Sequence, residues 1–167
     1  MGAWGITMRE SDDGLDMLDT IVTEQFKAVD FAYLDVAAAL ELLSQKILEE
    51  IKRANRGCTP EELDFYIKAN FQRSFTQAAL LVAECAADVY RDGVLLVCEY
   101  VRPHYTHIEH RVPEVRITPD SKAVLLQELR SVQDSEHEMY RSWFDEETRQ
   151  EWLAYVRMLQ RVLEEQP

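Results

Sequence analysis

The chain has 167 residues, of which 47% are hydrophobic, and it carries 31 acidic and 18 basic residues for a formal net charge of −13. This length and composition predict one domain, residues 1–167, that builds its own core without disulfides or a structural metal. The negative charge argues against direct binding of a nucleic-acid backbone, because like charges repel, and it permits a basic protein surface as partner.

The cysteines and the apolar segments indicate the cellular compartment in which we expect the protein. Cys58, Cys85 and Cys98 are odd in number and lack a CxxC spacing, so we expect neither a disulfide framework nor a thiolate zinc site. No apolar stretch is long enough to span a bilayer, and no signal-peptide pattern is present. We therefore expect a soluble cytoplasmic protein that begins at Met1, does not engage a membrane and tucks Trp4 against its domain.

Two helices are predicted first. Ser11 followed by Asp12 and Asp13 indicates a helix start, because a hydroxyl caps free N–H groups and acids suit the helix dipole. Apolar residues recur at helical spacing from there to Phe26. A second helix is expected from about Asp35 to Asn55, and its inward positions are Val36, Leu40, Leu43, Ile47 and Ile51.

One edge of the first helix is strongly acidic. Asp12, Asp16 and Asp19 fall on one stripe at i, i+4 and i+7, with no lysine or arginine between them. Repulsion among these carboxylates lowers helix stability unless a basic partner, or Arg9 folding back, offsets it. The stripe is therefore a candidate partner-binding surface.

The middle of the chain predicts two further helices. Thr59-Pro60-Glu61-Glu62 combines a cap, a proline at the first position and a reciprocal glutamate, and a short helix is expected from there to about Asn70. From Thr76 to Arg91 nearly every position is apolar, which predicts the central buried helix. Its polar residues share one narrow stripe: Gln77, Glu84, Asp88 and Arg91.

A change of pattern after Gly93 predicts strands. Residues 94–101 are apolar and rich in β-branched side chains, which is typical of a strand. Residues 112–118 are expected to pair with it, at an edge because of Pro113. The result is a small two-stranded hairpin near residues 94–118.

The C-terminal part returns to helix. Thr118-Pro119-Asp120 predicts a helix start, a break is expected near residues 133–135, and an aromatic-rich amphipathic helix follows. Trp143 lies at the junction of these helical segments, where an exposed aromatic could serve as a hot spot for binding. The fold class is thus mainly α, a compact domain of about five to six helices with one small hairpin.

The histidines are the most tempting chemical cluster. His104, His107 and His110, with Glu99 or Glu109, offer the ligand types that zinc accepts. However, three-residue spacing converges only on a helix, and this segment is predicted to be a polar hairpin loop or an extended segment, in which such positions diverge. We therefore expect no metal or other cofactor, and we keep a metal-dependent enzyme as an alternative.

Catalytic motifs are missing from the sequence. There is no nucleophile elbow, P-loop or dinucleotide-binding glycine pattern, and the paired carboxylates near 61 and 146 are explained by helix starts. No catalytic residue is predicted, and we expect a protein that is not an enzyme.

The N-terminus carries a family resemblance. The opening MGAWG (Met1–Gly5) and the acidic run Glu10–Asp19 resemble a group of uncharacterised small bacterial proteins, common in gut Firmicutes, that open with MGAWG and an acidic SDxGLD helix. Segments Arg53–Cys58 and Thr148–Leu153 are also similar to that group. The resemblance implies a small cytoplasmic bacterial protein and brings no catalytic residues.

These observations lead to one functional hypothesis and two alternatives. The hypothesis is a non-enzymatic, acidic protein-binding module of inhibitor or immunity type, which engages a basic surface such as that of a nucleic-acid-binding enzyme of a defence or toxin system. Its candidate contacts are Asp12, Asp16, Asp19 and Trp143. The alternatives are the histidine-based metalloenzyme and a homo-oligomeric scaffold built through the terminal aromatic helix.

Overall fold

The computed structural model describes residues 5–101 and 104–167, apart from the side chains of residue 28 and of residues 98–105. Trp4, which was expected to anchor the N-terminus, lies outside this range. The fold is mainly α with one small antiparallel hairpin, as predicted. In chain order the elements are η1 (Met8–Glu10), α1 (Asp12–Thr20), η2 (Ile21–Gln25), α2 (Phe26–Val29), β1 (Leu34–Asp35), α3 (Val36–Ala54), α4 (Pro60–Asp92), β2 (Val94–Val101), β3 (His104–Arg111), β4 (Val115–Arg116), α5 (Pro119–Ser131), α6 (Glu138–Arg141) and α7 (Glu146–Glu165).

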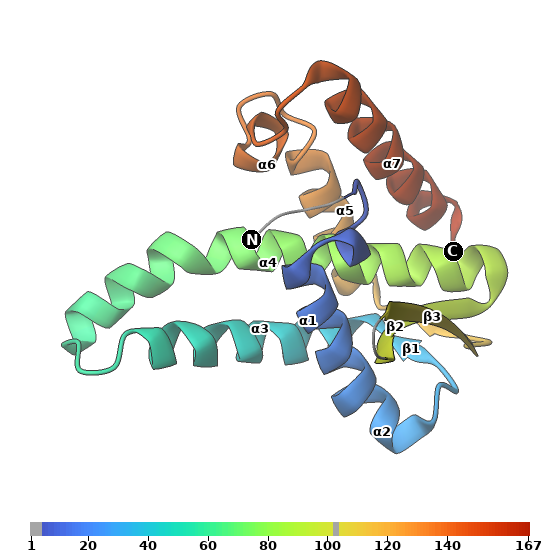
Figure 1. Cartoon of the computed structure of the whole chain (residues 1–167), viewed down its shortest axis with the longest axis horizontal. Helices are drawn as coiled ribbons and strands as arrows, with labels where there is room; N and C mark the ends of the chain where they lie inside the picture. The colour runs from blue at the N-terminus through green and yellow to red at the C-terminus, as the bar shows by residue number, and fades with distance from the viewer. Residues whose placement is uncertain (1–4, 102–103) are drawn as a thin grey trace.

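Helix α4 is the central element. In Figure 1 it runs along the length of the molecule, with α3 antiparallel on one side and α5 to α7 on the other. Helix α1 crosses both α3 and α4 near their middle. One hydrophobic cluster joins side chains of α1, α3, α4, α5 and α7. Among the helices that the structure describes, none combines the length and the apolar character needed to cross a membrane.

The predicted starts of α1, α3 and α4 are confirmed, and each is capped by a side chain. Ser11 accepts a hydrogen bond from the N–H of Gly14, 3.1 Å away, and Asp35 accepts one from Ala38 at 3.0 Å. The side chains of Thr59 and Glu62 form the expected capping box at the start of α4. The five inward positions predicted for the second helix are all buried: Val36, Leu40, Leu43, Ile47 and Ile51.

The first helix is less regular than its sequence pattern suggests. It continues from α1 through η2, a π-helical segment, into α2 and ends at Val29. Asp30 and Phe31 then adopt left-handed backbone conformations, with φ of 45° and 59°. This turn places the Phe31 ring between two others, stacked on Phe26 at 4.4 Å and on His110 at 3.9 Å between ring centroids.

The expectation of two separate helices between residues 60 and 91 is wrong, because α4 is one continuous helix of 33 residues. No glycine or proline interrupts residues 70–76. The rings of Phe71 and Phe75 stack one turn apart, at 5.8 Å between centroids, and the Thr76 hydroxyl donates to Glu128 of α5. Tertiary contacts thus support the segment where a break was expected.

The hairpin is confirmed, but its second strand is not the one predicted. Strand β2 pairs antiparallel with β3, with Val94 opposite Arg111 and Val101 opposite His104, so the histidine segment is itself a strand rather than a loop. Within residues 112–118, β4 instead pairs parallel with β1. The physical reason is local: an antiparallel partner needs only a short connection, and Pro113 has no N–H to extend the ladder.

Candidate functional site

The acidic stripe predicted on the first helix is present on the surface of α1. Asp12, Asp16 and Asp19 are all exposed. Within the described residues, none of the three carboxylates forms an ion pair with a lysine or arginine. Lys46 of α3 reaches the end of α1, but its Nζ donates to the Thr20 hydroxyl at 2.5 Å. As far as the described part of the chain shows, the three carboxylates therefore face solvent without a basic partner.

The short turn η1 is fastened to the central helix by buried polar contacts. The N–H of Met8 donates to Oε2 of Glu84 at 2.8 Å. Nη1 of Arg9 lies 3.4 Å from Oε1 of Glu84, and its Nη2 also pairs with Asp88, one turn further along α4. The side chain of Arg9 is only 10% exposed and that of Glu84 only 2%. Arg9 thus points into the molecule, away from the acidic stripe.

A glycine allows the turn and the helix to pack this closely. A Cβ on Gly14 would lie 1.7 Å from the carbonyl oxygen of Met8, so a larger residue there would push η1 away from α1. The Ser11 hydroxyl bridges the two elements, because it donates to the Met8 carbonyl at 2.8 Å and accepts from Gly14. The sequence Ser-Asp-Asp-Gly therefore fixes α1 relative to the Arg9 side chain.

The cluster around Glu84 is buried, and burial shifts the pKa values of its members upward. Burial raises the pKa of Glu84 despite the opposing charge of Arg9. Burial, and next the charge of Glu84, also raise the pKa of Tyr155, whose hydroxyl faces this carboxylate without a hydrogen bond of regular geometry. Burial raises the pKa of the neighbouring Cys85 thiol to about 12, so it is not a nucleophile at neutral pH.

Strand geometry separates the histidines that could have bound a metal. His107 is exposed and His110 is half-buried against Phe31, and positions three apart on a strand point to opposite faces. The side chains of His104 and Glu99 lie outside the described residues. In the part of the chain that is described, no group of three or more histidine, cysteine or carboxylate side chains is placed to hold a metal ion.

Trp143 is less exposed than its place between two helices suggested. It is half-buried and packs on Trp152 of α7, with ring centroids 5.7 Å apart. Its carbonyl accepts a hydrogen bond from Arg149 at 3.2 Å. The neighbouring Phe144 is instead fully exposed, at 101%. Trp143 was the predicted contact, whereas the exposed side chain at this junction is that of Phe144.

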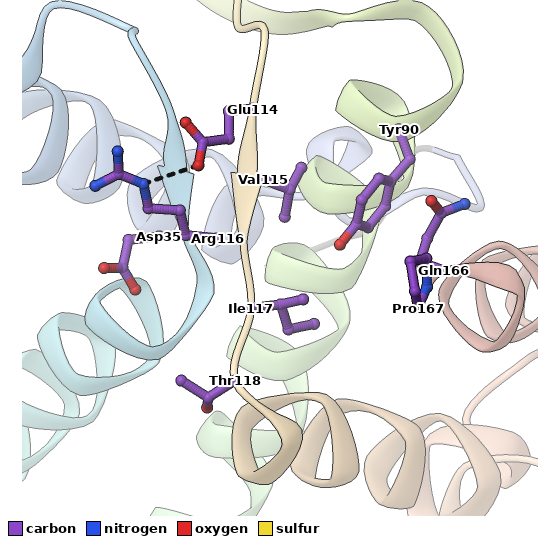
Figure 2. A pocket seen from close by; sticks show the side chains of 9 residues that line it. All are labelled: Asp35, Tyr90, Glu114, Val115, Arg116, Ile117, Thr118, Gln166 and Pro167. Carbon is purple, nitrogen blue, oxygen red and sulfur yellow. Dashed lines mark hydrogen bonds and ion pairs between the residues drawn. The ribbon is translucent and has the colours of Figure 1, made fainter.

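A surface hollow of about 480 Å³ lies beside β4 (Figure 2). Its arginine, Arg116, is already engaged, because it bonds the Glu114 carboxylate at 3.0 Å and lies 3.6 Å over the Tyr33 ring. Asp35, also in the lining, caps α3. Val115 and Ile117 point towards Tyr90 across the hollow in Figure 2. These groups hold the local structure together and do not form an acid–base or nucleophilic arrangement.

A comparison with family models, curated proteins and solved structures found no match for this chain. Its own architecture defines its class. It is a mainly α protein in which one buried and one partly buried ion pair fasten an N-terminal turn to a central helix. An acidic helix lies on the surface beside that turn.

Proposed function

We propose that this chain is a non-enzymatic protein-binding module of the cytoplasm, of inhibitor or immunity type, which engages a basic surface of its partner through Asp12, Asp16 and Asp19. The observation that carries the proposal is the burial of Arg9. Arg9 is the only lysine or arginine in the first 26 residues, and its guanidinium pairs with Glu84 and Asp88 instead of the acidic stripe. The acidic stripe is left with its full negative charge.

Repulsion among its own carboxylates distinguishes this stripe from an ordinary solvated face. Like charges three and four residues apart on a helix repel, and each such pair lowers helix stability by about 0.2–0.5 kcal/mol. A basic partner would relieve this repulsion on binding. The net charge of −13 would also attract such a partner over a distance and raise the association rate, with a strong dependence on salt.

The junction before α7 is a second proposed contact, separate from the acidic stripe. A fully exposed phenylalanine beside a half-buried tryptophan is a composition typical of binding hot spots. Trp143 therefore stays a proposed contact, with Phe144 as its more accessible neighbour. A basic protein such as a nucleic-acid-binding enzyme of a defence or toxin system carries the surface chemistry that this arrangement suits.

Affinity capture with three forms of the protein tests the proposal. The wild type, the Asp12→Asn/Asp16→Asn/Asp19→Asn variant and a control variant would each be used to capture proteins from a bacterial lysate at low and high salt. The control, Glu147→Gln/Glu151→Gln/Glu165→Gln, removes the same number of charges from exposed positions of α7. The proposal predicts a basic protein retained at low salt by the wild type and the control only. Equal retention by all three proteins would contradict it.

A further inference from the structure

The α3–α4 hairpin projects well beyond the rest of the fold, at the left of Figure 1. We refer to residues 49–73 as the arm. All of them are described, and Ile51 alone among them is buried, at 9% exposure. Helix α4 is likewise described throughout, and its twelve buried residues all lie between Thr76 and Val89. The outer half of the longest helix therefore contributes nothing to the fully buried core.

This outer half is nevertheless rich in large apolar side chains. Phe65 is 66% exposed and Tyr66 is 37% exposed, and their rings meet edge to face at 5.7 Å. Leu63, Ile67 and Phe71 are only half-buried. Two adjoining exposed aromatic rings are typical of an interaction site, since water contact with aromatic rings is unfavourable.

The charge of the arm indicates what covers it. The arm holds five acidic and five basic residues, so its net charge is zero, whereas the whole chain carries −13. The net negative charge therefore lies entirely outside the arm. Two copies of this chain repel each other over most of their surface, and the arm is the region where they can approach without net repulsion.

The exposed stripe of the arm is also complementary to itself. Glu62, Phe65, Tyr66, Ala69 and Arg73 recur at helical spacing on one side of α4, and all are exposed. A second copy placed antiparallel across a two-fold axis near residues 67 and 68 would set Glu62 opposite the partner copy's arginine at position 73. The same axis sets each Tyr66 opposite a small Ala69. In this arrangement each Glu62 faces an arginine, and each Tyr66 ring faces the small side chain of an alanine.

We propose that the arm is a homodimer interface, in which the exposed stripe of α4 packs antiparallel on the same stripe of a second copy. Such an interface is isologous, as in most symmetric dimers. It lies on a surface different from the acidic stripe of α1, and it stands whether or not the proposed basic partner exists. The aromatic side chains of the terminal helix do not offer a comparable surface, because Trp152 is buried and Tyr155 is half-buried.

Sedimentation velocity over a wide range of protein concentrations tests the proposal. The expected result is a concentration-dependent monomer–dimer equilibrium. Phe65→Ala/Tyr66→Ala should raise the dimer dissociation constant at least about tenfold, as loss of a hot spot does. The control is Phe144→Ala, which removes an even more exposed ring outside the arm and should leave the dissociation constant unchanged. A wild type that stays monomeric at every concentration would overturn the proposal.

A charge exchange tests the antiparallel register itself. Glu62→Arg and Arg73→Glu should each weaken the dimer, and the double variant should restore it, because the two positions face each other across the axis. Thr59→Ala and Glu138→Gln serve as controls, since Glu62 also caps α4 and Arg73 also pairs with Glu138. Circular dichroism checks that each variant is folded. If neither single exchange changes the dimer dissociation constant, the interface lies elsewhere and the proposal is overturned.

Discussion

Arg9 and Glu84 form a buried ion pair, with 3.4 Å between Nη1 and Oε1, that joins the N-terminal turn to the middle of the longest helix. The same carboxylate accepts the N–H of Met8, so one side chain holds both the backbone and the charge of η1. Because α1 follows η1 after a single capping residue, this pair also fixes where the acidic stripe of α1 lies. The surface proposed for binding therefore depends on a contact beneath it.

The buried pair predicts a strong energetic coupling. Arg9→Met should lower the free energy of unfolding by about 3 kcal/mol, because it leaves Glu84 and Asp88 without a counter-charge in a largely buried site. Combining it with Glu84→Gln should cost less than the sum of the two single changes. Urea denaturation of the wild type, both single variants and the double variant measures this coupling. Additive effects would show that the two side chains do not interact.

The pH dependence of stability follows from the raised pKa of Glu84. Burial lifts this pKa above its ordinary value of 4.5, so between 4.5 and the folded pKa the native state binds the proton more strongly than the unfolded chain does. Lowering the pH through this window should therefore stabilise the wild type relative to Glu84→Gln. Urea denaturation of both proteins between about pH 8 and about pH 5 measures the difference. A difference that stays constant, or that changes in the opposite direction, would show that the charge of Arg9 outweighs burial and that the pKa of Glu84 is not raised.

The acidic stripe should reduce the stability of the protein that carries it. Asp16 has a like charge on either side, at positions 12 and 19, so Asp16→Asn should raise the free energy of unfolding by about 0.5 kcal/mol. Asp12→Asn should change it little, because Asp12 lies at the helix start where the dipole favours a negative charge. Thermal unfolding at low salt compares the two variants. A loss of stability in Asp16→Asn would indicate that this carboxylate has a stabilising partner.

The cysteines should differ in reactivity. Cys85 is fully buried and burial raises its pKa to about 12, so roughly one thiol in 10⁴ is ionised near pH 8. Cys58 lies in the turn before α4 and is half-buried. Iodoacetamide should therefore modify Cys58 in the folded protein and Cys85 only after unfolding, as peptide mass spectrometry can show. Equal labelling of the two in the folded state would contradict the packing of α4.

The two aromatic residues before α7 should respond differently to truncation. Trp143→Ala should lower the free energy of unfolding by about 2–3 kcal/mol, because the ring packs on Trp152. Phe144→Ala should change it by less than about 0.5 kcal/mol, as is usual for an exposed side chain. Differential scanning calorimetry distinguishes them. The reverse order would mean that the phenylalanine, not the tryptophan, supports the start of α7.

Features set by neighbouring residues could be predicted from the sequence. Ser11, Asp35, Thr59 and Thr118 each cap a helix, and each cap acts on an N–H group only three residues further on. The exposure of the acidic stripe also followed from spacing alone, since the apolar residues of the same helix define which side is buried. Local chemistry is therefore enough for these elements.

Features set by distant residues could not be predicted in the same way. The pairing of β4 with β1, the support that Glu128 gives to the middle of α4, and the contact of Arg9 with Glu84 all join segments far apart in the chain. The sequence did contain a signal for the contact of Arg9 with Glu84, but an ambiguous one: Glu84 and Asp88 are charges on the polar stripe of an otherwise apolar helix. A buried charge requires a counter-charge, but the sequence offers many arginines and lysines that could supply it.

Hydrogen exchange of the captured complex tests the central claim most directly. The amides of this protein would be followed by mass spectrometry with and without the basic partner, at low and at high salt. The account predicts slower exchange in α1, residues 12–20, which returns to the rate of the free protein when salt is added. Slower exchange confined to other helices, or slower exchange in α1 that persists at high salt, would contradict binding through the acidic stripe.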